Sequence, residues 1–418
     1  MTFKSLLFCA IGFLAMSCHN DDGDYEMITV AEAKFMSKTE FRMSVDIAQP
    51  QPIKRAGKIY AYNDYIFVND LNEGVHILDN SNPRNPIAIK YIKIPGNEDI
   101  SIKNNFLYAD SATDLVVFDL SDMNKIMLVE RLEDVFEVYN YHIPFEAQAS
   151  DFNGFNYETD VIVGWNLKTE RREKSEINPG GIWIDFAMDA AFSSAAESTV
   201  GIGGSLARFQ IVNNYLYTVG PSNMSIFNIQ NLANPVHENS QYSRWNIETM
   251  FQADGYLYLG STNGMYIYSL ENPEQPMYIS EFTHWEGCDP VVVDGDYAYL
   301  TLRGGNLCGQ DESVLEIIDI KDKFNPTLVK RYTLENPYGL GFIGDKFFIC
   351  EGDLGLKLYN RTSPTILSFS KTIGSVHATD VIPLPDKLLL IGDNKLTQFK
   401  YSSDSRIGLE LLSSLRLN

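Results

Sequence analysis

The stretch DGYLYLGSTNGMYIYSLENPEQP, from Asp254 to Pro276, decides the fold of this chain. Aromatic and aliphatic residues alternate with small or polar ones on both sides of the turn STNG, which predicts two antiparallel strands. The segment ENPEQP that follows has the Asn and Pro residues typical of a loop. The remaining question is whether this hairpin is a single element or one copy of a repeat.

The same pattern recurs along most of the chain. When each copy is aligned on the residue that opens its DGYLYL-like strand, four of the six intervals between copies are 41 residues, and the other two are longer by 68 and 8 residues. Each copy holds four short apolar runs separated by turn residues, which predicts four strands. The aligned residues are Tyr65, Phe106, Tyr215, Tyr256, Tyr297, Lys346 and Lys387.

A period near 40 residues with four strands is typical of a β-propeller blade. One blade cannot cover its own two faces, so blades pack against one another in a ring. The seven copies predict an all-β fold, a β-propeller of seven four-stranded blades. Six blades fit if one copy is degenerate, and eight fit if TDVIVGWNL (Thr159–Leu167) belongs to a further blade. Either EFRMSVDI near residue 40 or the C-terminal GLELLSSLRL closes the ring.

The N-terminus has the pattern of an export signal. Lys4 precedes an apolar run from Leu6 to Met16, which is too short to span a bilayer. The following LAMSC resembles a bacterial lipobox, and this resemblance implies that Cys18 carries lipid; ordinary signal-peptidase cleavage is the alternative. HNDDGDYE after Cys18 resembles the surface-export signal of Bacteroidetes lipoproteins, unless it is only a solvated linker.

We therefore expect three regions. Residues 1–17 form the signal peptide, residues 18–50 form a lipid-anchored tether and lead-in with a short helix at TVAEAKFMSK, and residues 51–418 form the propeller. An insertion at about 138–206 interrupts the propeller and contains a predicted hairpin in YETDVIVGWNLKTERREK.

The third strand of each copy carries a recognisable motif. GVHILDNSNPRNP, LVVFDLSD and LEIIDIKDKFNP resemble the LVIVD repeat, in which an apolar strand ends in Asp before a Ser/Asn-Pro turn. The Asp is replaced in three other copies by Asn228, Ser269 and Asn360. The resemblance covers residues 50 to 400 and implies an exported or surface β-propeller, often a Bacteroidetes lipoprotein. It implies no reaction, because the motif residues belong to strands and turns.

The charge of the chain excludes one class of partner. The net charge is −22 and the pI is about 4.6, so nucleic-acid binding is not expected. The six His residues lack metal-ligand spacing, and no phosphate-binding loop, nucleophile elbow or His-Glu-x-x-His motif is present. We assign no catalytic residue and no cofactor, although the acidic surface suits a cation such as calcium.

Functional residues are expected on one face of the propeller. The loops that lead into the innermost strands and the loops between second and third strands open on this face, here called the loop face. Cys288 and Cys308 fall on loops of one blade there and predict a disulfide in an exported protein, with two unpaired thiols as the alternative. Cys350 is predicted to be a buried core thiol, and His284 and His377 also fall on this face.

Acidic residues alternate with aromatic and basic ones around the predicted channel mouth. Aromatic rings beside carboxylates are suited to a sugar, and the mixed charges suit another polar ligand or a cation. The alternative is that the acids cap turns and the aromatic rings wedge blades together. The candidate ligand-binding residues are Glu98, Asp99, Arg208, Trp245, Glu248, Trp285, Asp289, Arg303, Tyr338 and Asp380.

These features lead to three functional hypotheses. The favoured one is a monomeric, lipid-anchored propeller of the outer membrane or cell surface, facing outside or the periplasm, that binds a carbohydrate or an envelope protein. The second is an extracellular glycan hydrolase or lyase that uses carboxylates at the channel mouth. The third is a structural component of outer-membrane assembly.

Overall fold

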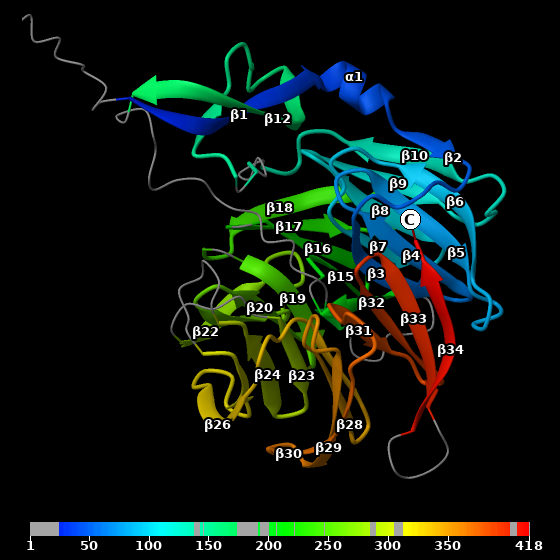
Figure 1. The fold of residues 1–418 in the computed structure, drawn as a ribbon, viewed down its shortest axis with the longest axis vertical. Coiled ribbons are helices and arrows are strands. Elements are labelled where there is room, and N and C mark those ends of the chain that lie inside the picture. The colour runs from blue at the N-terminus through cyan, green and yellow to red at the C-terminus, as the bar shows by residue number, and fades with distance from the viewer. Residues whose placement is uncertain are drawn as a thin grey trace, which may run out of the picture. The chain divides into compact units, whose positions relative to one another are not determined.

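The chain forms two compact units (Figure 1). Unit 1 is drawn from Met1–Phe35 and Asn140–Asp185, and unit 2 from Met36–Tyr139 and Phe186–Asn418. The computed structural model describes residues 25–137, 143–144, 146–173, 191–192 (backbone only), 200–205, 207–220, 222–245, 247–284, 290–304, 312–401 and 408–417. Five of the candidate site and cysteine residues named above lie outside them: Cys18, Trp285, Cys288, Asp289 and Cys308.

Unit 1 is a three-stranded sheet in the order β11-β1-β12, with β1 (Tyr25–Ser37) in the middle, β11 (Ala149–Asp151) and β12 (Asp160–Glu173). The expected helix at TVAEAKFMSK was wrong, because Val30 to Glu32 pair with β11 from the insertion. The expected hairpin was also wrong, because β12 is one continuous strand. In both cases pairing with a segment distant in the sequence outweighs the local preference. The segment Thr159–Leu167, considered above for a further blade, lies mostly in β12 and so belongs to this sheet.

Unit 2 begins with a short helix, α1 (Lys38–Met43). Ser37 caps it, because the Ser37 hydroxyl accepts the backbone N–H of Glu40 at 3.2 Å. The Arg42 guanidinium makes two hydrogen bonds to the buried Asp114 carboxylate, at 2.8 and 3.0 Å. Lys38 and Arg42 also pair with Asp134, so ion pairs hold α1 to the sheet that contains Asp114.

Unit 2 contains seven sheets in its described residues, six with four strands and one with seven. Figure 1 shows them around a common centre, with the first strand of each repeat innermost. Sheet 1 consists of β3 (Ala56–Tyr62), β4 (Tyr65–Asp70), β5 (Gly74–Asp79) and β6 (Ile87–Lys93), extended outward by β2 (Asp46–Ala48) and inward by β14 (Ile202–Ser205) and β13 (Ala191–Phe192).

The other six sheets follow in chain order. They are sheet 2, β7 (Ile100–Lys103), β8 (Phe106–Ser111), β9 (Asp114–Asp119) and β10 (Met127–Leu132); sheet 3, β15 (Phe209–Val212), β16 (Tyr215–Val219), β17 (Asn223–Asn228) and β18 (Val236–Tyr242); sheet 4, β19 (Ile247–Ala253), β20 (Tyr256–Ser261), β21 (Gly264–Ser269) and β22 (Met277–Thr283); sheet 5, β23 (Val291–Asp294), β24 (Tyr297–Leu302), β25 (Val314–Asp319) and β26 (Thr327–Thr333); sheet 6, β27 (Leu340–Ile343), β28 (Lys346–Cys350), β29 (Leu356–Ser363) and β30 (Ile366–Ile373); and sheet 7, β31 (Asp380–Pro383), β32 (Lys387–Gly392), β33 (Lys395–Tyr401) and β34 (Leu409–Arg416). The all-β prediction with four strands in each repeat is confirmed.

Sheet 7 packs against sheet 1. The backbone N–H of Ile53 donates to the Leu417 carbonyl at 2.8 Å, and the side chains of Asn80 and Gln398 exchange hydrogen bonds of 3.0 and 2.6 Å. The C-terminal β34 is the fourth strand of sheet 7, whereas the N-terminal β2 pairs outside β6. The C-terminal segment thus completes the last sheet, and the N-terminal segment reinforces the first.

The LVIVD-like motif forms a turn closed by a side-chain oxygen. The Asp79 carboxylate accepts the backbone N–H of Ser81, two residues on, at 2.9 Å. Asp119 and Asp319 make the same contact at 2.8 and 2.9 Å. Where the motif departs from Asp, the side-chain oxygens of Asn228 and Ser269 still accept the N–H two residues on. These replacements keep the turn because any short side chain with an oxygen can close it.

The repeated aromatic residues join neighbouring sheets. Tyr108, Tyr217 and Tyr299 each occupy the third position of a second strand and are fully buried. Their hydroxyls donate to carbonyls of the next sheet, in the turn between its third and fourth strands, at 2.8–2.9 Å. Tyr258 occupies the same position in sheet 4, but its buried hydroxyl has no hydrogen-bond partner among the described residues.

This difference between equivalent tyrosines gives a matched test. Tyr217→Phe leaves the Pro273 carbonyl without its donor, so we expect it to lower the free energy of unfolding by about 1–2 kcal/mol. Tyr258→Phe removes a buried hydroxyl that has no such partner and should be neutral or stabilising. Urea unfolding of the two variants measures this, and equal losses of stability would contradict the role of the Tyr217 hydroxyl between sheets.

The largest apolar cluster runs through several sheets of unit 2. It contains Ile59 of sheet 1 together with Leu389 of sheet 7, so the first and last sheets share one core. Aromatic side chains such as Phe347 fill the space between neighbouring sheets. The predicted burial of Cys350 is confirmed, since it belongs to this cluster and is 0% exposed.

Candidate functional site

The centre of unit 2 is occupied by a segment of the insertion. β14 pairs with the inner edge of β3, with Ile202 opposite Ala61 and Gly203 opposite Tyr60. The backbone N–H of Gly201 also donates to the Ile102 carbonyl of sheet 2 at 2.7 Å. β13, paired with β14, approaches the innermost strands β19, β23, β27 and β31. Residues 200–205, here called the channel segment, therefore fill the middle of the ring of sheets.

The glycines of the channel segment allow this close packing. A Cβ atom on Gly203 would stand 2.7 Å from the Tyr60 ring, and one on Gly204 would stand 2.1 Å from a carboxylate oxygen of Asp380. Both distances are shorter than any real contact. The Ser205 hydroxyl accepts the backbone N–H of Leu340 in sheet 6 at 3.0 Å. The sequence showed a Gly-rich stretch here, but nothing in it indicated that the stretch fills the channel.

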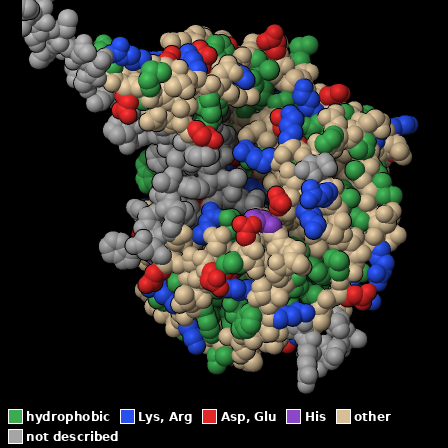
Figure 2. Space-filling model, in the orientation of Figure 1, with side chains coloured by type: hydrophobic (Ala, Val, Ile, Leu, Met, Phe, Trp, Pro, Cys, Tyr) green, Lys and Arg blue, Asp and Glu red, His purple; other side chains and the backbone are tan. Residues whose placement is uncertain are grey.

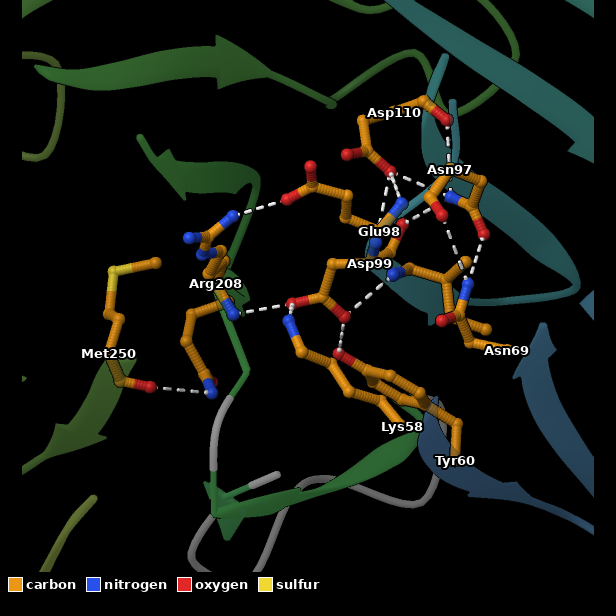
Figure 3. A network of polar contacts seen from close by, with 11 residues as sticks. Lys58, Tyr60, Asn69, Asn97, Glu98, Asp99, Asp110, Arg208 and Met250 are labelled. Carbon is orange, nitrogen blue, oxygen red and sulfur yellow. Dashed lines mark hydrogen bonds and ion pairs between the residues drawn. The ribbon is translucent and has the colours of Figure 1, made fainter. Parts of the chain in front are cut away.

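A network of carboxylates lies beside the channel segment (Figure 3). The Asp99 carboxylate is 1% exposed; it accepts hydrogen bonds from Lys58 Nζ at 2.9 Å, from the Tyr60 hydroxyl at 2.7 Å and from the backbone N–H of Arg208. Asp99 thereby joins sheets 1, 2 and 3. Burial and the charge of Asp99 raise the pKa of Tyr60, so the hydroxyl stays protonated and keeps donating.

Two further carboxyl groups complete the network. Glu98 forms an ion pair with Arg208, and both side chains are partly exposed. One Asp110 oxygen accepts from the Asn97 amide at 2.7 Å and from the backbone N–H groups of Glu98 and Asp99 at 2.9 and 3.0 Å. Burial and the charge of Glu98 raise the pKa of Asp110 to about 7.

The raised pKa of Asp110 predicts a pH effect on stability. The folded protein holds this proton up to about pH 7, whereas the unfolded chain releases it near the ordinary value of 3.8. The stabilisation is therefore complete below pH 4 and is lost as the pH rises to about 7, by up to ~1.4 kcal/mol per pH unit. Asp110→Asn keeps an acceptor oxygen and should flatten this slope in urea unfolding between pH 4.5 and 7. An unchanged slope would contradict the assignment.

A second group of polar side chains comes from three sheets of the loop face. The Arg303 guanidinium, after β24, lies 4.2 Å from the centre of the Tyr338 ring, which leads into β27. The Tyr338 and His377 rings are 6.5 Å apart, and His377 Nδ1 lies 2.7 Å from the exposed Asp353 carboxylate. Arg303, Tyr338, Asp353 and His377 are here called the Tyr338 cluster. Figure 2 shows acidic, basic and histidine side chains together near the middle of the sheets of unit 2.

The structure divides the sequence-predicted residues among separate places. Glu98, Asp99 and Arg208 lie in the carboxylate network, and Arg303 and Tyr338 lie in the Tyr338 cluster. Asp380 is buried against Gly204 of the channel segment. Trp245 and Glu248 belong to the start of sheet 4, where Trp245 is 65% exposed. Asp353 was missed, because an exposed Asp in the turn after β28 looks like any solvated turn residue.

Sequence reasoning also missed a buried carboxylate in sheet 5. Glu316 is 0% exposed, and its two oxygens contact His284 Nδ1 at 3.0 Å and Arg331 at 2.6 Å. Burial raises the pKa of Glu316, but the hydrogen bonds and charges of His284 and Arg331 outweigh it, and the pKa is lowered. The available signal was a Glu in the middle of the apolar strand LEIIDI.

Two properties that bear on function can be stated for the described part of the chain. No three His, Cys, Asp or Glu side chains there are grouped so that they could hold a metal ion. No helix there is long and apolar enough to cross a membrane. The cation considered from the sequence stays a prediction.

Comparisons with known proteins support a repeat protein with a β-propeller-like fold. Residues 54–91, 97–134 and 288–334 match the LVIVD repeat. The periplasmic gluconolactonase PpgL of Pseudomonas aeruginosa is similar in structure, with a TM-score of 0.51 and 9% identity over 86% of this chain and 96% of that one. At this identity the likeness shows the fold alone.

Two other solved structures are more distant. Kluyveromyces lactis Hsv2 has a TM-score of 0.47 and 12% identity over 87% of this chain and 100% of that one. The computationally designed protein Ika8 has a TM-score of 0.49 and 7% identity over 88% and 89% of the two chains. No curated protein matches the chain in sequence.

Proposed function

We propose that this protein is an exported, lipid-anchored binding module with a seven-bladed propeller. Cys18 carries the lipid, and the protein acts as a monomer at the outer membrane or cell surface. The loop face contacts a carbohydrate or an envelope protein. The support for export is the signal-like sequence up to Cys18 and the acidic residues that follow it. The support for seven blades is the seven sheets and the hydrogen bonds between sheet 7 and sheet 1.

The Tyr338 cluster is the observation that carries this function. It brings an aromatic ring, a guanidinium, an imidazole and a carboxylate together from loops of sheets 5, 6 and 7. The channel beneath is filled by the chain itself, and Asp99 and Asp380 are buried. A ligand would therefore contact the loops rather than enter the channel. A small number of polar groups beside an aromatic ring is typical of a binding site.

The test compares a variant of the cluster with a matched surface variant. We expect Tyr338→Ala to weaken binding of the wild-type ligand, found on a carbohydrate array, by at least about tenfold, because an aromatic centre of a site commonly contributes 2 kcal/mol or more. Phe324→Ala removes an equally large exposed ring from the β25–β26 turn and should leave binding unchanged. If the Tyr338→Ala variant and the wild type bind the ligand equally well, the Tyr338 cluster is not part of the ligand site.

The lipid anchor has its own test. Cells expressing the wild-type protein and fed radiolabelled palmitate should yield a labelled protein, and Cys18→Ala should yield none, because the acyl chains attach at that residue. If the wild-type protein carries no label, it has no lipid anchor, and ordinary signal-peptidase cleavage is the remaining explanation of the N-terminal sequence.

One observation favours the glycan-active enzyme as the second candidate. Asp110 has a pKa raised to about 7 beside the ionised Glu98, and a raised carboxyl pKa is what a general acid needs. If the protein cleaves any glycan, and Glu98→Gln, Glu248→Gln and Asp289→Asn abolish that turnover, the binding module is the wrong function.

A further inference from the structure

A pair of exposed aromatic side chains stands at the start of sheet 4. Trp245, on the short connection between β18 and β19, is 65% exposed, and Tyr242, the last residue of β18, is 50% exposed. Their ring centres are 5.7 Å apart and their planes meet at 73°. The two rings therefore form a corner, and each ring keeps much of its surface in contact with water. An exposed tryptophan beside an exposed tyrosine indicates a contact surface more strongly than a single exposed apolar residue does.

The backbone holds this corner in one position. Ser243, between the two aromatic residues, is buried, and its N–H donates to the Ser222 carbonyl at 2.8 Å. Ile247, just after the connection, is 1% exposed. Arg244 has a φ of +82°, a conformation that costs free energy for any residue other than Gly. Such strain persists where the surroundings enforce it, and it is often found at binding sites.

Charged groups flank the aromatic corner. The Arg244 guanidinium carbon lies over the Tyr278 ring of β22, 4.1 Å from its centre. The Tyr278 hydroxyl donates to the Glu281 carboxylate at 3.1 Å. A guanidinium that contacts an aromatic ring still has N–H groups that can donate hydrogen bonds to a ligand. The corner is thus bordered by a set of donors and a carboxylate acceptor.

We propose that Tyr242, Arg244, Trp245, Tyr278 and Glu281, here called the aromatic platform, bind a neutral pyranose unit of a glycan. This inference deepens the proposed function and rests on it. The apolar C–H face of a pyranose ring stacks on the indole, which removes apolar surface from water. Hydroxyl groups at the rim of the sugar both donate and accept hydrogen bonds. Sugar hydroxyl groups can therefore donate to the Glu281 carboxylate and accept from the Arg244 guanidinium.

The net charge of the protein favours a neutral ligand over an acidic one. With a net charge of −22 the chain repels polyanions, and one guanidinium beside Glu281 does not reverse that field. A proline-rich peptide also stacks on aromatic rings, but its backbone offers mainly carbonyl acceptors and would give the Glu281 carboxylate no donor beyond the Tyr278 hydroxyl. The platform therefore favours a neutral sugar over both.

Affinity electrophoresis in gels containing laminarin, xyloglucan or yeast mannan tests the platform on the full mature protein. We expect at least one of these neutral polysaccharides to retard the wild type and Trp245→Ala to weaken that retardation at least tenfold. Arg244→Gly should also weaken it, while unfolding at no lower urea concentration, because Gly accepts the positive φ. Pectin and alginate, as acidic polymers, should not retard the wild type.

Tyr338→Ala is the comparison variant, because it alters the other aromatic group of the loop face, and we expect it to weaken retardation as well. If Tyr338→Ala abolishes retardation and Trp245→Ala does not, the platform is overturned while the binding function stands. If a proline-rich peptide binds in a Trp245-dependent way and no neutral polysaccharide does, the sugar assignment is overturned. Absence of binding to all three polysaccharides also overturns it.

Discussion

Replacing Asp99 by Ala is expected to lower the free energy of unfolding of unit 2 by about 3–5 kcal/mol. The change leaves the Lys58 ammonium, whose side chain is 10% exposed, without its counter-ion. The buried Tyr60 hydroxyl and the backbone N–H of Arg208 lose their acceptor in the same step. Urea unfolding followed by intrinsic fluorescence measures the loss.

A matched control separates this buried pair from an exposed one. Glu98→Ala breaks the neighbouring pair with Arg208, whose side chains are 21% and 26% exposed, and should cost about 0–1 kcal/mol. The double variant Lys58→Met/Asp99→Leu removes both charges and should recover the part of the loss that comes from the unpaired Lys58 ammonium, but not the part that comes from the Tyr60 hydroxyl and the Arg208 N–H. If Asp99→Ala costs no more than Glu98→Ala, Asp99 does not join the three sheets.

The repeat and its turns could be predicted from the sequence because the forces that form them are local. Asp79 closes its turn with the N–H of Ser81, and Ser269 does the same with Glu271, so a reader of the sequence finds the turn without knowing the fold. Tyr108, Tyr217 and Tyr299 recur at a fixed position, from which each hydroxyl reaches the same turn of the next sheet.

The candidate site could be predicted only in part, because burial there depends on distant segments. Asp99 lies next to Glu98 in the chain, and both looked like charges at a channel mouth. Arg208 then binds Glu98 through its side chain and Asp99 through its backbone, so that Glu98 stays partly exposed and Asp99 is enclosed. No local sequence pattern predicts that Asp99 is buried while Glu98 stays partly exposed.

Filling of the channel also changes which side chains can carry function. Asp380 was a candidate because of its place before an innermost strand, yet it packs against Gly204. On the loop face, Trp245 remains exposed and Tyr338 remains partly exposed. The insertion therefore moves the expected ligand contacts outward, from the innermost strands to the loops.

Gly204→Val should be the most damaging single change in the channel segment. Its Cβ would stand 2.1 Å from a buried Asp380 oxygen, and β14 is held between β3 and Leu340, so neither side can move without breaking hydrogen bonds. Forced overpacking costs about 1–3 kcal/mol or more, which urea unfolding detects. Gly374→Val, at an exposed turn with no atom within 4 Å of the added Cβ, is the matched control and should be nearly neutral. Equal stability of the two variants would mean that the channel segment does not fill the ring, and Asp380 would again be a candidate ligand contact.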